Sequence, residues 1–136
     1  MLSKQRRVML IDDNEVDLKI NSKIIEISKF FDDIILCKSG EEGLSYLNNY
    51  MSDEANLPDL ILLDIQMPEM DGFEFLEIFK KFPQSLTDKC LIAILSSTLD
   101  FGDITKAEAS QYVIKLLKKP LLPKDLEDVL VKHLII

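Results

Sequence analysis

An aspartate ends the apolar run LILL at residues 60–63, and this residue, Asp64, raises the first chemical question of the sequence. A charged group is costly to bury, so an acid at the end of a core segment needs a structural partner or a chemical role. Other polar residues end apolar runs in the same way: Asp12 and Asp13 after 8–11, Ser96 after 91–95, and Lys119 after 113–117. Each alone is typical of a cap or a turn, but together they favour one site.

The chemistry that suits this set is the transfer of a phosphoryl group to a carboxylate. Clustered carboxylates repel one another, so they must share a proton or a cation. Magnesium binds one or two carboxylates and completes its shell with water and phosphate oxygens. An ammonium from Lys119 and a hydroxyl from Ser96 can hold the remaining phosphoryl oxygens.

Five short apolar runs define the elements that must position these residues. They lie at 8–11, 34–36, 60–63, 91–95 and 113–117. Most are continuous, which is typical of strands covered on both faces, and segments with helical spacing separate them. This order predicts an α/β fold with a doubly wound five-stranded parallel sheet, three layers and right-handed crossovers. The polar residues then lie at the carboxyl edge of the sheet, where such folds bind ligands.

The predicted helices begin at residues that favour helix starts. These are Asn14, Ser39, Asp71 and Pro123, and a weaker helix is predicted from about Asp103 to Gln111. The first helix is predicted to bury one apolar stripe, made of Val16, Ile20, Ile24, Ile27 and Phe31. The alternation uses the whole chain, so residues 1–136 are predicted to form a single domain.

Composition excludes several functional classes. The chain has 136 residues and a net charge of −8, which argues against nucleic acid as a partner because phosphate binding needs a basic surface. No apolar window approaches the roughly 20 residues of a membrane helix. Cys37 and Cys90 lack metal-site spacing and are interpreted as buried residues of a protein in a reducing cytoplasm.

Four motifs resemble the receiver domain of two-component response regulators. They are LIDDNEVD at 10–17, PDLILLDIQMPEMDG at 58–72, ILSS at 94–97 and KKPL at 118–121. The resemblance covers essentially the whole chain and implies the flavodoxin-like (βα)5 fold of the chemotaxis regulator. It implies a stand-alone receiver without an output domain.

The resemblance also implies a role for each site residue. Asp64 is then the phospho-acceptor, which attacks the phosphorus of a phosphohistidine. Mg²⁺ would be bound by Asp13, Asp64 and the main-chain carbonyl of Gln66, and by Asp12 through water. Ser96 and Lys119 would hold the phosphoryl oxygens. The donor would be a histidine kinase or histidine phosphotransfer protein, and the target would be an unknown protein. The only catalysis would be the phosphorylation and dephosphorylation of the receiver by itself.

Two features depart from the family pattern. Many receivers place an aromatic residue three positions before the lysine, where this chain has Leu116, and Tyr112 is out of register. The resemblance therefore implies switching through loop and helix repositioning instead of a ring flip. The segment 107–120 also lacks the small pair that often precedes the fifth strand, so the preceding helix is expected to pack differently.

Three alternatives belong to other functional classes. A haloacid-dehalogenase-type phosphatase needs an acid two residues after its nucleophile, where this chain has Gln66. A nucleotide-binding Rossmann domain needs a glycine-rich loop after the first strand, where this chain has DDNE at 12–15. A phosphorylation-independent interaction module stays open. The only histidine, His133, is interpreted as a packing residue.

Overall fold

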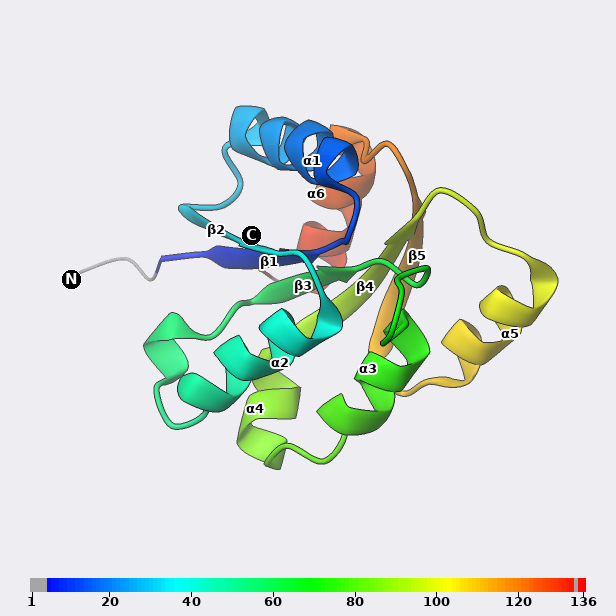
Figure 1. Ribbon diagram of the computed structural model, residues 1–136. Coiled ribbons are helices and arrows are strands. Elements are labelled where there is room, and N and C mark those ends of the chain that lie inside the picture. The colour runs from blue at the N-terminus through cyan, green and yellow to red at the C-terminus, as the bar shows by residue number, and fades with distance from the viewer. Residues whose placement is uncertain (1–4, 134) are drawn as a thin grey trace.

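The computed structural model describes residues 5–133 and 135–136, and five parallel strands form its central sheet (Figure 1). The strands are β1 (Arg7–Ile11), β2 (Asp33–Cys37), β3 (Leu60–Leu63), β4 (Leu91–Ser96) and β5 (Val113–Lys118). Their order is β2-β1-β3-β4-β5. β1 and β3 are buried along their whole length, as continuous apolar runs predict.

Helices cover both faces of this sheet. They are α1 (Glu15–Ser28), α2 (Gly40–Asn49), α3 (Gly72–Phe79), α4 (Gln84–Lys89), α5 (Phe101–Ala109) and α6 (Pro123–Lys132), with a short 3-10 turn at Glu54–Asn56. In Figure 1, α1 and α6 lie on one face, α2, α3 and α4 lie on the other, and α5 stands beside the edge strand β5. The predicted doubly wound, three-layered α/β fold is confirmed.

Two apolar layers hold the helices to the sheet. On one face, Phe75 and Phe79 of α3 are fully buried together with Leu47 of α2. On the other face, Leu18 of α1 packs in the same cluster as Leu126 of α6. Each layer removes large apolar side chains from water, and this burial is the main force that fixes the helices on the sheet.

The predicted helix starts are confirmed. Asn14 accepts a hydrogen bond from Asp17 N at 3.0 Å, and Ser39 accepts one from Glu42 N at 3.1 Å. Asp71 forms a reciprocal capping box with the third residue of α3, and α6 begins at Pro123. The weaker helix begins at Phe101, slightly earlier than predicted, because Asp100 caps it.

The predicted buried stripe of α1 is only partly right, because Ile24 and Phe31 pack against the core but its other members are exposed. Val16 is 64% exposed and Ile27 is 66% exposed, whereas the buried residues of this helix are Leu18, Asn21 and Ile25. The sequence also allows a second stripe, made of Leu18, Asn21 and Ile25. The polar asparagine weakened the hydrophobic signal of that stripe. Asn21 is buried because its side chain has a backbone partner, Leu121 N.

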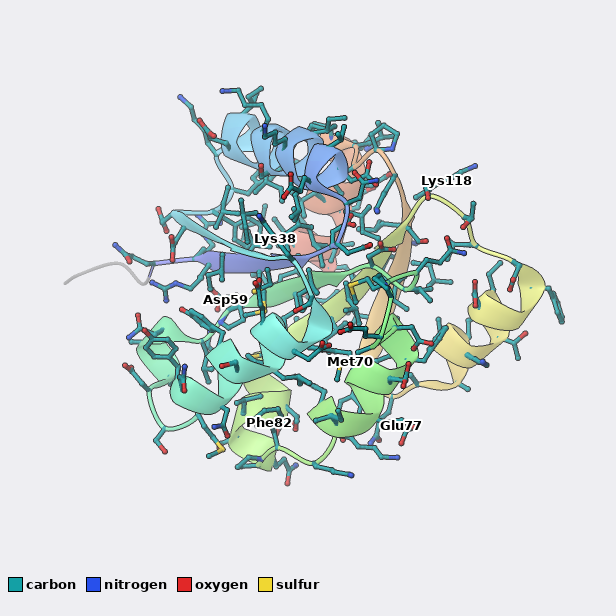
Figure 2. All side chains as sticks on the ribbon, in the orientation of Figure 1. Lys38, Asp59, Met70, Glu77, Phe82 and Lys118 are labelled. Atoms are coloured by element: carbon teal, nitrogen blue, oxygen red, sulfur yellow. The ribbon has the colours of Figure 1, made fainter. Side chains whose placement is uncertain are left out.

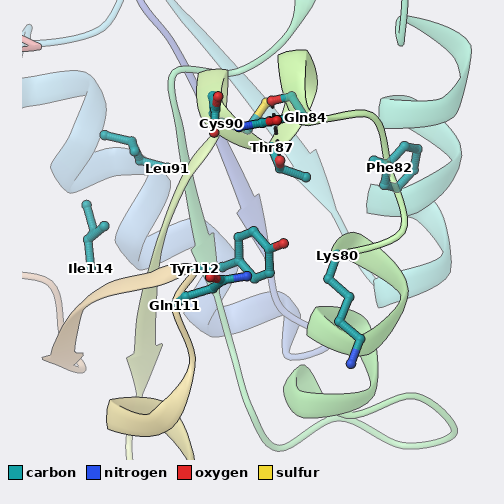
Figure 3. Close-up of a pocket in the computed structure, with 10 residues that line it drawn as sticks. Lys80, Phe82, Gln84, Thr87, Cys90, Leu91, Gln111, Tyr112 and Ile114 are labelled. Atoms are coloured by element: carbon teal, nitrogen blue, oxygen red, sulfur yellow. Dashed lines mark hydrogen bonds between the residues drawn. The ribbon is translucent and has the colours of Figure 1, made fainter.

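Helix α4 is absent from the sequence prediction. It is only six residues long, with Leu86 as its buried apolar residue, so periodicity gave no signal. A buried ion pair between Lys89 and Asp59 ties the end of α4 to the start of β3. A pocket of about 480 Å³ lies between α4 and the start of β5 and includes Phe82 and Tyr112 in its lining (Figure 3).

That pocket lies at the amino edge of the sheet. The predicted site residues Asp12, Asp13 and Asp64 lie at the opposite, carboxyl edge. Among the helices of the described residues, none combines the length and apolar character needed to cross a membrane.

Candidate functional site

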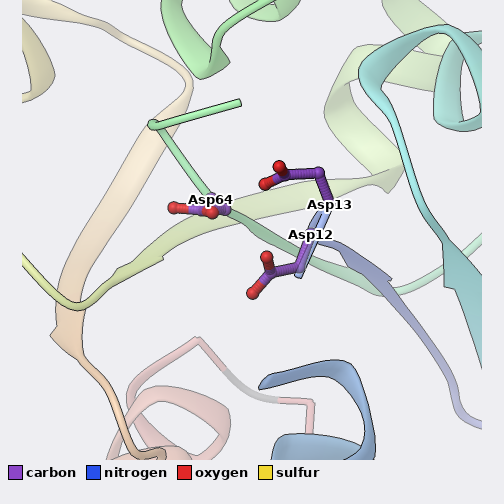
Figure 4. Close-up of side chains that lie close together, drawn as sticks. All are labelled: Asp12, Asp13 and Asp64. Carbon is purple, nitrogen blue, oxygen red and sulfur yellow. The ribbon is translucent and has the colours of Figure 1, made fainter. Parts of the chain in front are cut away.

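The register of the sheet brings Asp12 and Asp64 together. Ile11 of β1 is paired with Leu63 of β3, so the residues that follow them emerge side by side at the carboxyl edge. Asp64 N donates to Ile11 O at 3.0 Å, and Asp12 N donates to the carbonyl of the last residue of β2, also at 3.0 Å. These backbone hydrogen bonds hold both acids in place, and Figure 4 shows Asp13 beside them.

The three acids form a set of oxygen ligands. Asp12, Asp13 and Asp64 each offer a carboxylate oxygen, and these oxygens lie within 4.8 Å of one another. Asp12 and Asp64 are buried, whereas Asp13 is exposed and opens the cluster to solvent. Asp12 Oδ2 is buried, and the ammonium of Lys119 lies 2.5 Å from it. Three clustered carboxylates, two of them buried and one facing solvent, suit a hard divalent cation.

Lys119 extends into this cluster from the end of β5. Its Nζ lies 2.5 Å from Asp12 Oδ2, 3.0 Å from Asp17 Oδ2 and 3.4 Å from Asp64 Oδ2. Its side chain is only 7% exposed, whereas the preceding Lys118 is exposed to solvent (Figure 2). Of the two adjacent lysines, the predicted one lies among the acids.

Negative charge is in excess here, and the pKa values respond to it. Burial raises the pKa of Asp64 to about 6, Lys119 opposes that rise, and Asp12 adds to it. Burial lowers the pKa of Lys119. Hydrogen bonds to Asp12 and Asp17 and the charge of Asp64 together raise it by more than burial lowers it, so the net shift is upward. The ammonium therefore stays charged, and a second cation would favour the charged form of Asp64.

Ser96 and Gln66 lie at the same edge in different settings. Ser96 is fully buried at the end of β4, and its Oγ donates to Thr98 O at 3.0 Å. Its hydroxyl is therefore engaged with its own loop. Gln66 N donates to Asp64 Oδ1 at 3.3 Å, which holds the chain after Asp64 close to its carboxylate.

The loop between β3 and α3 packs tightly on the backbone of Asp64. A Cβ on Gly72 would lie 2.8 Å from Asp64 O and 2.9 Å from Ile65 Cα, closer than real Cβ atoms approach. Gly72 N also donates to Ile65 O at 2.9 Å. Only glycine fits this position without moving the loop, which gives a structural reason for the MPEMDG motif.

Two residues of α1 that the sequence analysis did not single out belong to this region. Asp17 pairs with Lys119, and Asn21 accepts a hydrogen bond from Leu121 N at 2.9 Å. They are polar residues one helical turn apart on the side of α1 that faces the sheet. The four-residue spacing of Asp17 and Asn21 was the sequence signal that could have identified them. The apolar stripe that contains Ile20 and Ile27 gave a stronger hydrophobic pattern, so the prediction followed that stripe.

The residue in the usual aromatic position packs with aliphatic neighbours. Leu116 contacts a small apolar cluster that contains Ile65, Ile94 and Ala107. Tyr112 instead packs edge-on against Phe79, in the apolar layer between the sheet and helices α2 and α3, with ring centroids 5.5 Å apart. Tyr112 is therefore separate from the aspartate cluster.

Comparison with known proteins connects this arrangement to a family. The family model described as the response regulator receiver domain matches residues 8–130. The polar-differentiation response regulator DivK of Brucella abortus is 30% identical over 117 residues, which cover 85% of this chain and 88% of DivK.

Two solved structures have the same fold. A two-component response regulator from Cytophaga hutchinsonii has a TM-score of 0.89 and 33% identity, covering 98% of this chain and 100% of its own. A response regulator receiver protein from Dyadobacter fermentans has a TM-score of 0.84 and 31% identity, covering 93% of this chain and 96% of its own.

Other relatives are far longer than this chain. The protein-glutamate methylesterase/protein-glutamine glutaminase of Trichodesmium erythraeum is 30% identical over 131 residues, and the chain spans only 36% of its length. The match to residues 8–130 covers nearly all of the sheet and its helices, including Asp12, Asp64 and Lys119. The chain therefore belongs to the response regulator receiver domain family of two-component signalling.

Proposed function

We propose that the protein accepts a phosphoryl group on Asp64 from a phosphohistidine and changes a partner-binding surface in response. The observation that carries this proposal is the position of Asp64. Its carboxylate is held at the end of a buried strand, within 4.8 Å of the oxygens of two other acids and 3.4 Å from the ammonium of Lys119. A nucleophile needs this combination of rigid support and nearby positive charge.

The transfer step is a substitution at phosphorus. A carboxylate oxygen of Asp64 forms a bond to the phosphorus, and the bond between phosphorus and the imidazole nitrogen of the donor breaks. The electron pair of that bond returns to the nitrogen, so the products are an aspartyl phosphate and, when the other ring nitrogen of the donor carries a proton, a neutral histidine. Lys119 stabilises charge on the phosphoryl oxygens, and Ser96 can do so after its hydroxyl leaves Thr98 O.

Magnesium is the cofactor that this ligand set supports. Asp13, Asp64 and the main-chain carbonyl of Gln66 would hold it directly, and Asp12 would hold it through water. When bound, it offsets the repulsion between an anionic carboxylate and an anionic phosphoryl group. The support is the cluster of oxygens described above.

The proposed donor is a histidine kinase or a histidine phosphotransfer protein. One relative is described as hybrid signal transduction histidine kinase L of Dictyostelium discoideum. It is 29% identical over 131 residues, and this chain spans 7% of it. We propose that the protein acts in the cytoplasm, because Cys37 and Cys90 are free, buried thiols, and burial raises the pKa of each to about 12.

The test is incubation with phosphoramidate and Mg²⁺, followed by intact-mass measurement. The wild-type protein should gain one phosphoryl group, and a chelator should prevent the gain. Asp64→Asn should gain none. An adduct of equal yield in Asp64→Asn, or no adduct on wild type with any small donor, would leave phosphorylation-independent partner binding as the better account.

A further inference from the structure

We infer that Asp17 is a positioning residue that competes with the phosphoryl group for the ammonium of Lys119. This inference rests on the proposed function, because it concerns the same lysine. Asp17 Oδ2 lies 3.0 Å from Lys119 Nζ, closer than the 3.4 Å that separates this nitrogen from Asp64 Oδ2. In the unmodified protein, Asp17 therefore shares Lys119 with the acceptor.

The backbone around Lys119 is fixed on both sides. Lys119 N donates to Ser96 O at 2.9 Å, and Leu121 N donates to Oδ1 of the buried Asn21 at 2.9 Å. The segment 119–121 is therefore tied both to β4 and to α1. With its backbone held in this way, Lys119 answers a change at Asp64 mainly by redistributing its side chain among the nearby carboxylates.

The start of α1 leaves the Asp17 carboxylate available for this pairing. Asp17 is the third residue of the helix, and its N donates to the cap residue Asn14. An acid at this position often accepts a hydrogen bond from the cap residue N in return. Here Asn14 N donates to Asp12 Oδ1 at 2.9 Å instead. The carboxylate of Asp17 is thus free to reach across to Lys119.

Asp17 differs from the other partners of Lys119. Asp12 and Asp64 belong to the oxygen cluster proposed to hold the cation, whereas Asp17 does not. When a cation occupies that cluster, Asp17 is the carboxylate that remains available to the ammonium. A phosphoryl group on Asp64 must then draw Lys119 away from Asp17. The pair with Asp17 consequently favours the unmodified state.

The test measures the affinity for beryllofluoride, which binds a carboxylate as an analogue of its phosphoryl group. Fluorine NMR titrations at saturating Mg²⁺ compare wild type, Asp17→Asn and Asp17→Glu. Asp17 is 32% exposed, so the pair is partly screened, and Asp17→Asn should bind about two- to tenfold more tightly. Asp17→Glu retains the charge and should stay closer to wild type than Asp17→Asn.

Glu15→Gln is the matched control. Glu15 lies in the same first turn of α1 and pairs with Lys38 at 3.0 Å, away from Lys119. Glu15→Gln removes the same charge as Asp17→Asn. Because Glu15 does not pair with Lys119, this variant should keep the beryllofluoride affinity of wild type. Equal affinities for Asp17→Asn and Glu15→Gln, or weaker binding by Asp17→Asn, would overturn the inference.

Two further measurements separate this inference from other accounts. The phosphoramidate concentration that gives half the maximal phosphorylation rate should fall in Asp17→Asn by a factor similar to the gain in affinity. A purely structural role would lower the unfolding temperature and leave both quantities unchanged, which would contradict competition. If wild type forms no adduct, the proposed function itself fails. If adducts form with unchanged affinities, only the role of Asp17 fails.

Discussion

The carboxylates of Asp12 and Asp64 stand side by side at the ends of β1 and β3, and Lys119 Nζ contacts both, at 2.5 Å and 3.4 Å. This relationship follows from strand register, because the residues that precede the two acids are paired. One ammonium cannot balance all the acids around it. The protein without metal therefore stores electrostatic repulsion at this edge, and several measurable properties depend on it.

Replacing Asp64 with asparagine should stabilise the metal-free protein near neutral pH. Burial and Asp12 raise the pKa of Asp64 to about 6, above its unfolded value, so its contribution to stability is lost as pH rises through 6. Asp64→Asn should gain about 1–3 kcal/mol at pH 7.5, and the gain should vanish below about pH 4. Denaturant unfolding in chelator checks this prediction.

Asp128→Asn is the control for that experiment. Asp128 is mostly exposed, and its Oδ1 lies 3.9 Å from Lys124 Nζ. The same chemical change there should alter stability little at any pH, since exposed pairs contribute little. A neutral-pH gain in Asp64→Asn no larger than that of Asp128→Asn would show that repulsion at Asp64 is not the cause.

Asp13→Asn should weaken Mg²⁺ binding. Asp13 is the solvent-facing member of the oxygen cluster and is proposed to be a direct ligand. Removing its charge should reduce affinity by about tenfold or more. Calorimetric titration measures this, with Glu15→Gln as an equal change of charge outside the cluster. Unchanged affinity in Asp13→Asn would remove that residue from the metal site.

Lys119→Ala should impair switching more than phosphorylation. The acceptor and the proposed metal ligands remain, so phosphoramidate should still produce an adduct. Without the ammonium, the modified Asp64 loses its partner at the residue that follows β5, and hydrogen exchange in the segment 97–109 should no longer respond to phosphorylation. Lys118→Ala, a change in the exposed neighbouring lysine, should respond as wild type does. A normal response in Lys119→Ala would exclude Lys119 from the switch.

Gly72→Ala should disturb Asp64 through its backbone. The added methyl group would meet Asp64 O at 2.8 Å, and such overpacking costs about 1–3 kcal/mol of unfolding free energy. The loop must shift, so the phosphorylation rate should fall as well. Gly102→Ala is the matched change, because its nearest neighbour is the Asp100 side chain at 3.4 Å. Equal stability and rates in the two variants would contradict the close approach.

The sequence predicted the sheet well because its central strands have two buried faces. Runs such as 60–63 are continuous in apolar residues and end in polar ones, so both the strand and the end of the strand are visible. The edge at which Asp12, Asp64 and Lys119 meet follows from parallel topology alone. The prediction for this part of the molecule needed no knowledge of side-chain contacts.

Contacts between distant residues were not visible in the same way. Asn21 is buried because of Leu121, a hundred positions away, and Asp17 reaches Lys119 over a similar separation. Hydrophobic periodicity treats both residues as exposed, so it chose a stripe of α1 that is only partly buried. Helix α4 was missed because six residues with one buried side chain, Leu86, carry almost no periodic signal.

The most direct test of the central claim identifies the acceptor residue itself. The protein is treated with phosphoramidate and Mg²⁺ and then reduced with borohydride, which converts an aspartyl phosphate to homoserine, and its peptides are sequenced by mass spectrometry. Homoserine should appear at position 64, and Asp12, Asp13 and Asp17 should remain aspartate. Homoserine at any of those three positions, or aspartate retained at position 64, would contradict the assignment of Asp64 as the acceptor.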